Sequence, residues 1–325
     1  MRSITVHELG PPETFTIEST DAPLPGPNEV RLASAFAGIS FVDVLVAAGR
    51  YQIKPPVPYV PGSEVAGVID AVGANVSETR IGERVCTLTE GGAFAERIIV
   101  PAAEAWHVPD DMPLENAAVF LASYSTSYYA LVNRAQVKAG ETVLVLGAGG
   151  AVGMAAVQIA KALGASVIAS ASTRDKRNLA LASGADSAVD SHAPDWRNLV
   201  KQANGGRPVD VVYDPVSGDA TEPAFRSLGW GGRYLVIGFA SGTIAKLPVN
   251  LPLLKGAALV GVDYRQALSH DSFLKEHLAE ALFAMWSTGA LSPKIAQIFA
   301  FEDFAAAMKL AASGQSAGRV LLQFA

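Results

Sequence analysis

The stretch of residues 141–153 constrains the fold more than any other part of the chain. It contains Thr142–Leu146, a short apolar and β-branched run typical of a strand buried on both faces. The glycines that follow allow a tight turn and a close approach of the backbone to a ligand: Gly147, Gly149, Gly150 and Gly153. Residues 151–163 then show helical spacing, and residues 166–169 form a second apolar run. Strand, glycine turn, helix and strand predict a dinucleotide-binding βαβ unit, with a pyrophosphate at the N-terminus of the helix.

The glycine spacing departs from the dinucleotide-binding fingerprint at one position. When Gly-x-Gly-x-x-Gly is read from Gly147, Val152 stands where the third glycine is expected. Read as Gly-x-x-Gly-x-x-Gly, the motif consists of Gly147, Gly150 and Gly153. A glycine turn without a ligand is the alternative, but the strand before it and the helix after it favour a cofactor site. We therefore expect the whole turn, including Ala151 and Val152, to bind the cofactor.

The residues after the second strand indicate which dinucleotide binds. An NAD site usually has Asp or Glu there, which accepts a hydrogen bond from the ribose 2′-hydroxyl. This chain instead offers hydroxyl groups and cations suited to a 2′-phosphate: Ser172, Thr173, Arg174 and Lys176. Asp175 is the one acid nearby, and its position fits helix capping. The sequence therefore predicts NADPH rather than NADH as the cofactor.

The composition excludes several classes of function. The 325 residues are half hydrophobic and carry a net charge of −6, which leaves no basic face for nucleic acid. No apolar run reaches the length of a membrane span, and the first residues lack the apolar core of a signal peptide, so we expect a cytoplasmic protein. Cys86 is the only cysteine, which excludes an internal disulfide and a cysteine-rich zinc site.

The pattern of short segments divides the chain into two domains. The N-terminal part has short strands separated by Pro and Gly, which predict an antiparallel partial barrel. Strands then alternate with helices, which predicts an open, mostly parallel sheet with helices on both faces. We place the β-rich domain at residues 1–120 and 262–325, and the Rossmann domain at residues 121–261. The apolar strand 259–263 near the sheet edge predicts a homodimer with a continuous sheet.

Several stretches together resemble one family, the zinc-independent quinone oxidoreductases of the medium-chain dehydrogenase/reductase superfamily. The matching segments cover nearly the whole chain: Ala37–Asp43, Gly49–Tyr51, Pro58–Val68, Gly82–Val85, Gly92–Glu96, Val157–Lys161, Leu163–Ala165, Val209–Gly218, Gly238–Gly242 and Gly318–Leu322. The resemblance implies an α/β protein that joins a GroES-like partial β-barrel, the catalytic domain, to a doubly wound Rossmann domain. It also implies an active-site cleft between the two domains.

The resemblance also bears on zinc. Zinc-dependent members have Cys and His at the positions that match Ser40 and Ser63, and only the acidic residue Glu64 is retained. A serine hydroxyl is a poor zinc ligand beside a thiolate or an imidazole. We therefore expect no metal.

For catalysis the resemblance points to four residues: Tyr51, Ser40, Asp43 and Thr126. Tyr51 matches the tyrosine of the family's Gly-x-Tyr segment, which donates a proton or stabilises an enolate in the enoyl reductase branch; stacking on the substrate or filling the cleft is the alternative. Ser40 stands where the family usually has Asn, and it shares a helix face with Asp43, which either orients a water or acts as a cap. Thr126 matches the family threonine near the nicotinamide ring.

The cofactor site is expected to include the ends of two further strands. Ligands bind at the carboxyl edge of such a sheet, and the resemblance places the nicotinamide half there. Residues from these strand ends and one from the last matching segment complete the expected cofactor-binding set: Asp214, Val216, Phe239, Ala240, Ser241 and Arg319.

The implied reaction is a hydride transfer from NADPH to an electrophilic carbon of a small-molecule carbonyl substrate. Quinones and other α,β-unsaturated carbonyls suit this chemistry because their oxygen accepts the resulting charge. An enoyl-CoA or enoyl thioester reductase is the first alternative, with Arg50, Lys54 and Arg265 as candidates for contacts to phosphate groups. A non-catalytic NADPH-binding protein is the second alternative.

Overall fold

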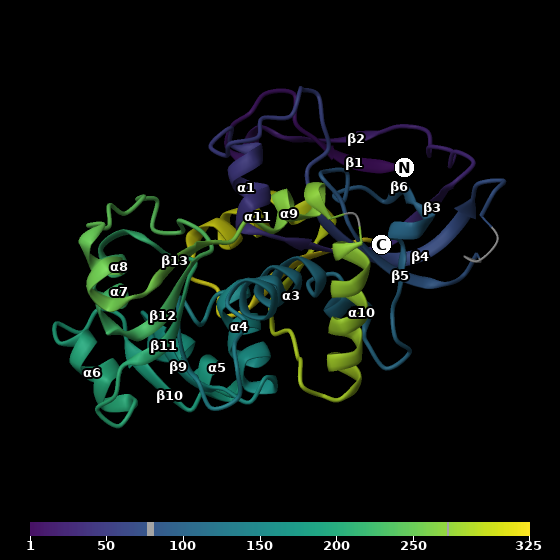
Figure 1. Cartoon of the computed structure of the whole chain (residues 1–325). Helices are drawn as coiled ribbons and strands as arrows, with labels where there is room; N and C mark the ends of the chain where they lie inside the picture. The colour runs from purple at the N-terminus through teal and green to yellow at the C-terminus, as the bar shows by residue number, and fades with distance from the viewer. Residues whose placement is uncertain (77–80, 272) are drawn as a thin grey trace. The chain divides into compact units, whose positions relative to one another are not determined.

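A computed structural model describes residues 1–76, 81–271 and 273–325 (Figure 1). The chain forms two compact units, one of residues 1–122 and 293–325 and one of residues 123–292. This differs from the boundary expected from the sequence, which groups residues 262–292 with the first unit.

Two contacts explain why residues 262–292 belong to the second unit. The ring of Tyr264 packs on that of Tyr129, with 6.3 Å between the centroids. The side-chain amide of Gln158 donates a hydrogen bond to the Ser292 carbonyl (3.0 Å) and accepts one from the Ser292 N–H (2.8 Å). Both ends of the segment are therefore attached to residues of the Rossmann domain.

The first unit is built around a mostly antiparallel sheet. Its strands follow the order β14-β15-β3-β4-β5-β7, and β6 also pairs with β3. The strands of this sheet are β3 (Glu29–Ile39), β4 (Glu64–Val72), β5 (Arg84–Leu88), β6 (Arg97–Pro101), β7 (Trp106–His107), β14 (Ile295–Ala300) and β15 (Arg319–Gln323). The last strand pairs antiparallel with β3, so both ends of the chain contribute to one sheet, as the sequence predicts.

The remaining elements of the first unit are short. A hairpin joins β1 (Arg2–Thr5) and β2 (Thr16–Ser19), and the helices are α1 (Phe41–Ala47), α2 (Leu114–Ala117) and α11 (Phe304–Ser313). Aliphatic strand residues and aromatic rings close the core, and Phe301 packs on Phe324 at 5.1 Å between centroids.

The second unit contains a parallel sheet in the order β10-β9-β8-β11-β12-β13. Every strand pair in this sheet is parallel. Its strands are β8 (Thr142–Leu146), β9 (Ser166–Ala171), β10 (Ser187–Asp190), β11 (Val209–Asp214), β12 (Leu228–Val236) and β13 (Ala258–Gly261). Its helices are α3 (Leu121–Tyr128), α4 (Ala151–Ala162), α5 (Arg174–Ala182), α6 (Trp196–Ala203), α7 (Thr221–Ser227), α8 (Asn250–Lys255), α9 (Tyr264–His270) and α10 (Leu274–Ser287).

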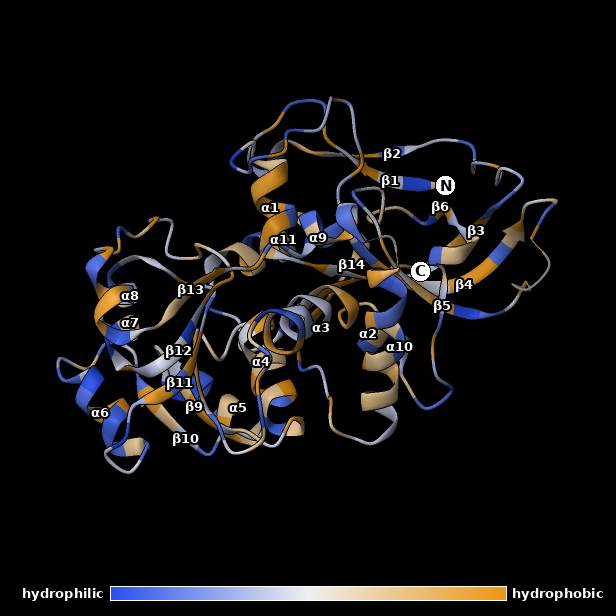
Figure 2. Cartoon of the chain, in the orientation of Figure 1, coloured by the Kyte–Doolittle hydropathy of each residue, from blue (hydrophilic) through white to orange (hydrophobic). Residues whose placement is uncertain are grey.

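Burial follows the sequence pattern closely in this unit. All five residues of β8 are buried, as expected for a central parallel strand with helices on both faces. The helix α4 buries a continuous run of eight residues, 153–160. By contrast, α6 is largely hydrophilic (Figure 2) and buries only Trp196 and Val200. A helix of that kind covers the sheet with one narrow face and leaves the rest in water.

Candidate functional site

The glycine turn after β8 is shaped by close backbone contacts. Gly147 adopts a left-handed conformation with φ +58°. A Cβ atom at Gly153 would lie 2.3 Å from the carbonyl oxygen of Gly147. Only glycine, which has no Cβ, avoids this clash. Gly150 precedes the first residue of α4 and caps it without a side chain. The first N–H groups of α4 are therefore left to other partners, as an anion site at a helix N-terminus requires.

The start of α5 lies directly against this turn. A Cβ at Gly149 would lie 2.5 Å from the Cβ of Lys176, so the glycine is needed for the two segments to approach. Burial lowers the pKa of the Lys176 ammonium. The hydroxyl of Thr173 caps α5 by accepting a hydrogen bond from the Lys176 N–H (3.3 Å). The structure thus brings together the two segments that the sequence assigns to the pyrophosphate and to the 2′-phosphate.

The other two residues of the expected 2′-phosphate set differ in exposure. Ser172 is half-buried, whereas Arg174 is exposed at the first position of α5. The sequence reasoning missed Arg177, which donates a hydrogen bond to the Ala171 carbonyl (3.1 Å) and forms an ion pair with Asp190 (3.0 Å). Arg177 therefore joins the carboxyl ends of β9 and β10, and its spacing from Arg174 on one helix was the available signal.

Asp214 braces the turn after β11. Its buried carboxylate accepts hydrogen bonds from the N–H groups of Val216 (2.7 Å) and Ser217 (2.8 Å) and from the Tyr234 hydroxyl. The carboxylate thus shapes the loop around the expected nicotinamide site. Val216 lies beside the glycine turn, because a Cβ at Gly147 would lie 2.9 Å from its Cγ2.

The segment after β12 is attached to the same turn. The N–H of Ala240 donates to the Pro215 carbonyl and the N–H of Ser241 to the Val216 carbonyl, each at 3.0 Å. Phe239 is 45% exposed, so much of its ring is open to a ligand. The strand ends expected to line the nicotinamide half therefore form one continuous surface with the glycine turn.

The helix α3 holds Thr126 among fixed neighbours. Thr126 is half-buried. Tyr124, two residues earlier, is buried and donates a hydrogen bond to the Gln158 side chain (2.7 Å). The Ser127 hydroxyl lies 2.9 Å from that of Tyr213. These bonds fix the rotation of α3 and hence the direction of Thr126.

In the first unit, Ser40 and Asp43 form a capping box at the start of α1. The Ser40 hydroxyl accepts a hydrogen bond from the Asp43 N–H (3.0 Å), and the Asp43 carboxylate accepts one from the Ser40 N–H (2.7 Å). Burial raises the pKa of Asp43, while hydrogen bonds from Ser40 and Ser63 oppose the shift. Both serines that replace zinc ligands in the resemblance are thus hydrogen-bonded to Asp43.

Beside this cap lies a buried ion pair. The guanidinium of Arg319 lies 3.0 Å from the carboxylate of Glu64, and their side chains are 5% and 1% exposed. Glu64 also accepts a hydrogen bond from the Ala122 N–H (3.0 Å). Burial raises the pKa of Glu64 to about 7, against the opposing effect of Arg319. Arg319, expected at the cofactor, is placed by the structure as the partner of Glu64.

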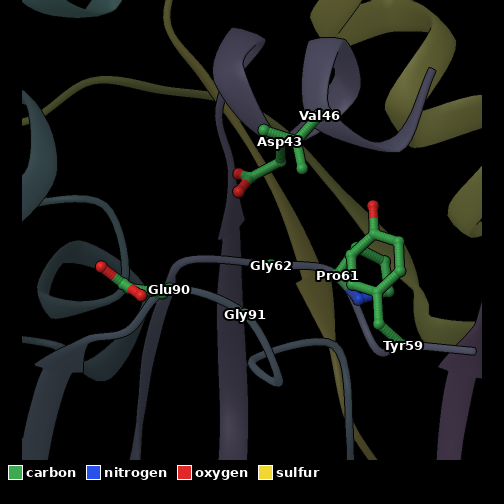
Figure 3. Close-up of a pocket in the computed structure, with 7 residues that line it drawn as sticks. All are labelled: Asp43, Val46, Tyr59, Pro61, Gly62, Glu90 and Gly91. Carbon is green, nitrogen blue, oxygen red and sulfur yellow. The ribbon is translucent and has the colours of Figure 1, made fainter. Parts of the chain in front are cut away.

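Tyr51 follows α1 after a glycine turn. Gly49 has φ +68°, and the Arg50 N–H donates to the Leu45 carbonyl (2.8 Å). Tyr51 itself is half-buried. The sequence reasoning missed Tyr59, whose place in the matching segment 58–68 was the available signal. Tyr59 lines a pocket of about 30 Å³ together with Asp43 and Glu90 (Figure 3).

The described ranges contain no group of three or more His, Cys, Asp or Glu residues that could hold a metal ion. No helix within those ranges is long and apolar enough to cross a membrane.

Comparisons with known proteins agree with this geometry. Residues 26–110 match the alcohol dehydrogenase GroES-like domain, and residues 151–280 match the zinc-binding dehydrogenase family. The chain is 37% identical over 323 residues to quinone oxidoreductase-like protein 2 of Rattus norvegicus, which covers 99% of this chain and 91% of that protein.

Two solved structures resemble this chain in fold. The Escherichia coli quinone oxidoreductase complexed with NADPH has a TM-score of 0.90 and 27% identity, covering 99% of this chain and all of that one (100%). The CurK enoyl reductase has a TM-score of 0.90 and 25% identity, covering 100% of this chain and 99% of that one.

Proposed function

Because the chain belongs to the quinone oxidoreductase family of the medium-chain dehydrogenase/reductase superfamily, we propose that it is a zinc-free, NADPH-dependent oxidoreductase that reduces quinones or other α,β-unsaturated carbonyls. The observation that carries the proposal is the approach of Lys176 to the glycine turn at Gly149. The Lys176 side chain begins beside the turn that leads into α4, and a cation and a helix N-terminus both favour phosphate groups.

The residues present fit NADPH. A Cβ at position 153 would collide with the Gly147 carbonyl, so glycine there lets the start of α4 pack closely against the turn. The N–H groups at the start of α4 would hold the pyrophosphate, and Ser172, Arg174 and Lys176 would hold the 2′-phosphate. The surface formed by Val216 and the segment after β12 would hold the nicotinamide. When bound, the cofactor supplies a hydride.

The zinc-free part of the proposal rests on the polar cluster behind α1, which consists of Ser40, Asp43, Ser63, Glu64 and Arg319. Ser40 and Ser63 hydrogen-bond to Asp43, and the Glu64 carboxylate pairs with Arg319. A zinc site needs thiolate, imidazole or carboxylate ligands that are free to bind the metal. We expect the activity to survive prolonged dialysis against a chelator, and a loss of activity that zinc restores would contradict this.

In this proposal the first unit is the catalytic domain, and one of its side chains supplies the proton that the reaction needs. Reduction of a quinone by hydride adds two electrons and one proton, so one further proton is needed to form the hydroquinone. Tyr51 is the proposed donor, since the half-buried phenol in the segment after α1 can protonate an oxyanion. Thr126 orients the nicotinamide side of the substrate. Full turnover by Tyr51→Phe on quinones and enones would remove Tyr51 from the chemistry.

The function is tested by following NADPH oxidation with 1,4-benzoquinone, 9,10-phenanthrenequinone, an alkenal and crotonyl-CoA. Fast turnover of the quinones with little on the thioester supports the proposal. A preference for crotonyl-CoA supports the second candidate, an enoyl thioester reductase, which the likeness to the CurK enoyl reductase favours. NADPH binding without any turnover supports a binding protein instead.

We also propose a homodimer formed through the edge of the parallel sheet. The edge strand β13 exposes three of its four residues. Large apolar side chains gather nearby, with Trp230 at 85% and Leu253 at 79% exposure. Such a patch beside the strand at the end of the sheet order, whose outer edge pairs with no strand in the described ranges, favours a second copy of the chain. Light scattering tests this, with Leu259→Lys on β13 expected to give monomers and Ile81→Lys in the first unit as the control. A cytoplasmic location belongs to the same proposal and is tested by cell fractionation.

A further inference from the structure

Tyr59 carries a hydrogen-bond donor that no described residue uses. Its hydroxyl oxygen is buried, and it is hydrogen-bonded to no residue in the ranges that the structure describes. Buried hydroxyl groups nearly always have a partner, because an unpaired one loses the bonds it makes to water without replacement. A ligand atom is therefore expected at this position.

The hydroxyl faces the pocket in the first unit. In Figure 3 it points toward α1, which carries Asp43 and Val46, while Glu90 lies on the other side of the pocket. The volume of about 30 Å³ holds one oxygen atom and the carbon attached to it. A carbonyl group at the end of a larger molecule fits such a space.

Among the residues that line the pocket, the Tyr59 phenol suits an oxygen on which negative charge develops. Burial, assisted by the nearby Asp43, raises the pKa of Tyr59 to about 12, so the phenol keeps its proton at neutral pH. Asp43, on another wall, already accepts hydrogen bonds from Ser40 and Ser63. A neutral donor held at a fixed position stabilises an oxyanion more strongly than mobile water molecules do.

We propose that this pocket binds the carbonyl oxygen of the substrate and that the Tyr59 hydroxyl donates a hydrogen bond to it. The inference rests on the proposed function, in which hydride arrival leaves an electron pair on that oxygen. Tyr59 holds the oxyanion through its hydrogen bond and keeps its own proton, and the proton consumed in the reaction comes from solvent through Tyr51. Tyr59 is thus assigned to charge stabilisation and Tyr51 to proton transfer.

The variant Tyr59→Phe tests the proposal because it removes only the oxygen. We expect kcat with 1,4-benzoquinone to fall about 100-fold, the loss typical of one oxyanion donor. The dissociation constant of NADPH should not change, and the melting temperature of the ligand-free protein should stay level or rise, since an unpaired buried hydroxyl is lost. Ser187→Ala is the matched control: it removes another buried hydroxyl that has no hydrogen-bond partner in the described ranges, on β10, so it should leave kcat unchanged.

A second readout does not depend on turnover. 4-Nitrophenolate carries a stable anionic oxygen, and its absorbance reports binding to the protein in the presence of NADP⁺. We expect the wild type to bind it at least about tenfold more tightly than Tyr59→Phe. That difference, found in a wild type that reduces no acceptor, would support the pocket while rejecting the proposed function.

Two results would overturn the proposal. One is unchanged kcat together with unchanged 4-nitrophenolate binding in Tyr59→Phe. The other is a lowered melting temperature of Tyr59→Phe with unchanged kcat, because the hydroxyl would then be hydrogen-bonded to a structural water in the pocket.

Discussion

The glycine turn of the second unit and the polar cluster behind α1 in the first unit are held in place by opposite means. The turn depends on absent side chains: at Gly153 a single Cβ would lie 2.3 Å from a carbonyl oxygen. The cluster depends on charged side chains that are almost fully buried, with Glu64 and Arg319 at 1% and 5% exposure. The clash made by a side chain in the turn cannot be relieved by a second substitution, because its neighbours are backbone atoms. The stability lost when one member of the ion pair is replaced can be recovered by replacing the other member as well.

The largest effect is expected from breaking the charge pair. Arg319→Met leaves Glu64 buried without its cation, which should lower the free energy of unfolding by about 3–5 kcal/mol. The double variant Arg319→Met, Glu64→Gln should recover much of this loss, because no buried charge is left alone. Urea unfolding followed by circular dichroism measures both. A single-variant loss below about 1 kcal/mol, the range of a surface pair, would show that the cluster is not electrostatically held.

The same cluster predicts how stability depends on pH. Burial raises the pKa of Glu64 to about 7 in the folded protein, from an ordinary value of 4.5. The folded state therefore binds this proton more tightly than the unfolded state does. The stabilisation is complete below about pH 4.5 and is lost as the pH rises through 7, at roughly 1.4 kcal/mol per unit of pKa shift.

Measuring the free energy of unfolding from pH 5 to 8 checks this. We expect the wild type to lose stability across that range, and Glu64→Gln to lose less. The raised pKa of Asp43 acts in the same direction, so some dependence should remain in the variant. A wild type that gains stability over this range would mean that Arg319, and not burial, dominates the pKa of Glu64.

On the steric side, Gly153→Ala should destabilise the protein by about 1–3 kcal/mol, the usual result of forcing an atom into filled space. It should also weaken NADPH binding, because the turn must open. Gly150→Ala is the matched control: its φ of −87° suits any residue and its Cβ would lie 3.3 Å from the nearest oxygen. Equal losses in the two variants would contradict the steric explanation.

A smaller effect is expected from the exposed cation of the expected 2′-phosphate site. Arg174→Ala should raise the Michaelis constant for NADPH about tenfold and leave that for NADH nearly unchanged, since only NADPH carries the phosphate. The control is Arg197→Ala, an exposed arginine on α6. Parallel changes for both cofactors would place Arg174 away from the phosphate.

The two regions also differ in how far the sequence predicts them. The β8–α4 turn follows from local order, since an apolar strand, glycines and a helix stand together in the chain. The partner of Glu64 could not be predicted, because Arg319 is 255 residues away and only the pairing of β15 with β3 brings the two together. Tyr59 was missed for a related reason: a tyrosine between prolines gives no sign that its hydroxyl will lack a partner.

The smallest effect is expected at Ser217, in the turn after β11, where the backbone is strained in a way that the sequence does not reveal. Ser217 has φ +63° and ψ −157°, a conformation that favours glycine and costs other residues about 1–3 kcal/mol. Its hydroxyl accepts a hydrogen bond from the Ala245 N–H (3.3 Å), worth about 0.5–1.5 kcal/mol. Glycine would also make the unfolded chain more flexible, at a cost of about 0.4–1 kcal/mol.

These opposing contributions nearly cancel, so Ser217→Gly should change the free energy of unfolding by less than about 1 kcal/mol. Ser217→Ala separates them, because it keeps the strained backbone and loses only the hydrogen bond; it should be less stable than both the wild type and Ser217→Gly. If alanine is as stable as serine, the hydroxyl contributes nothing. If glycine is the least stable of the three, the turn is not strained, and the hydrogen bond to Ala245 is what holds this loop beside the glycine turn.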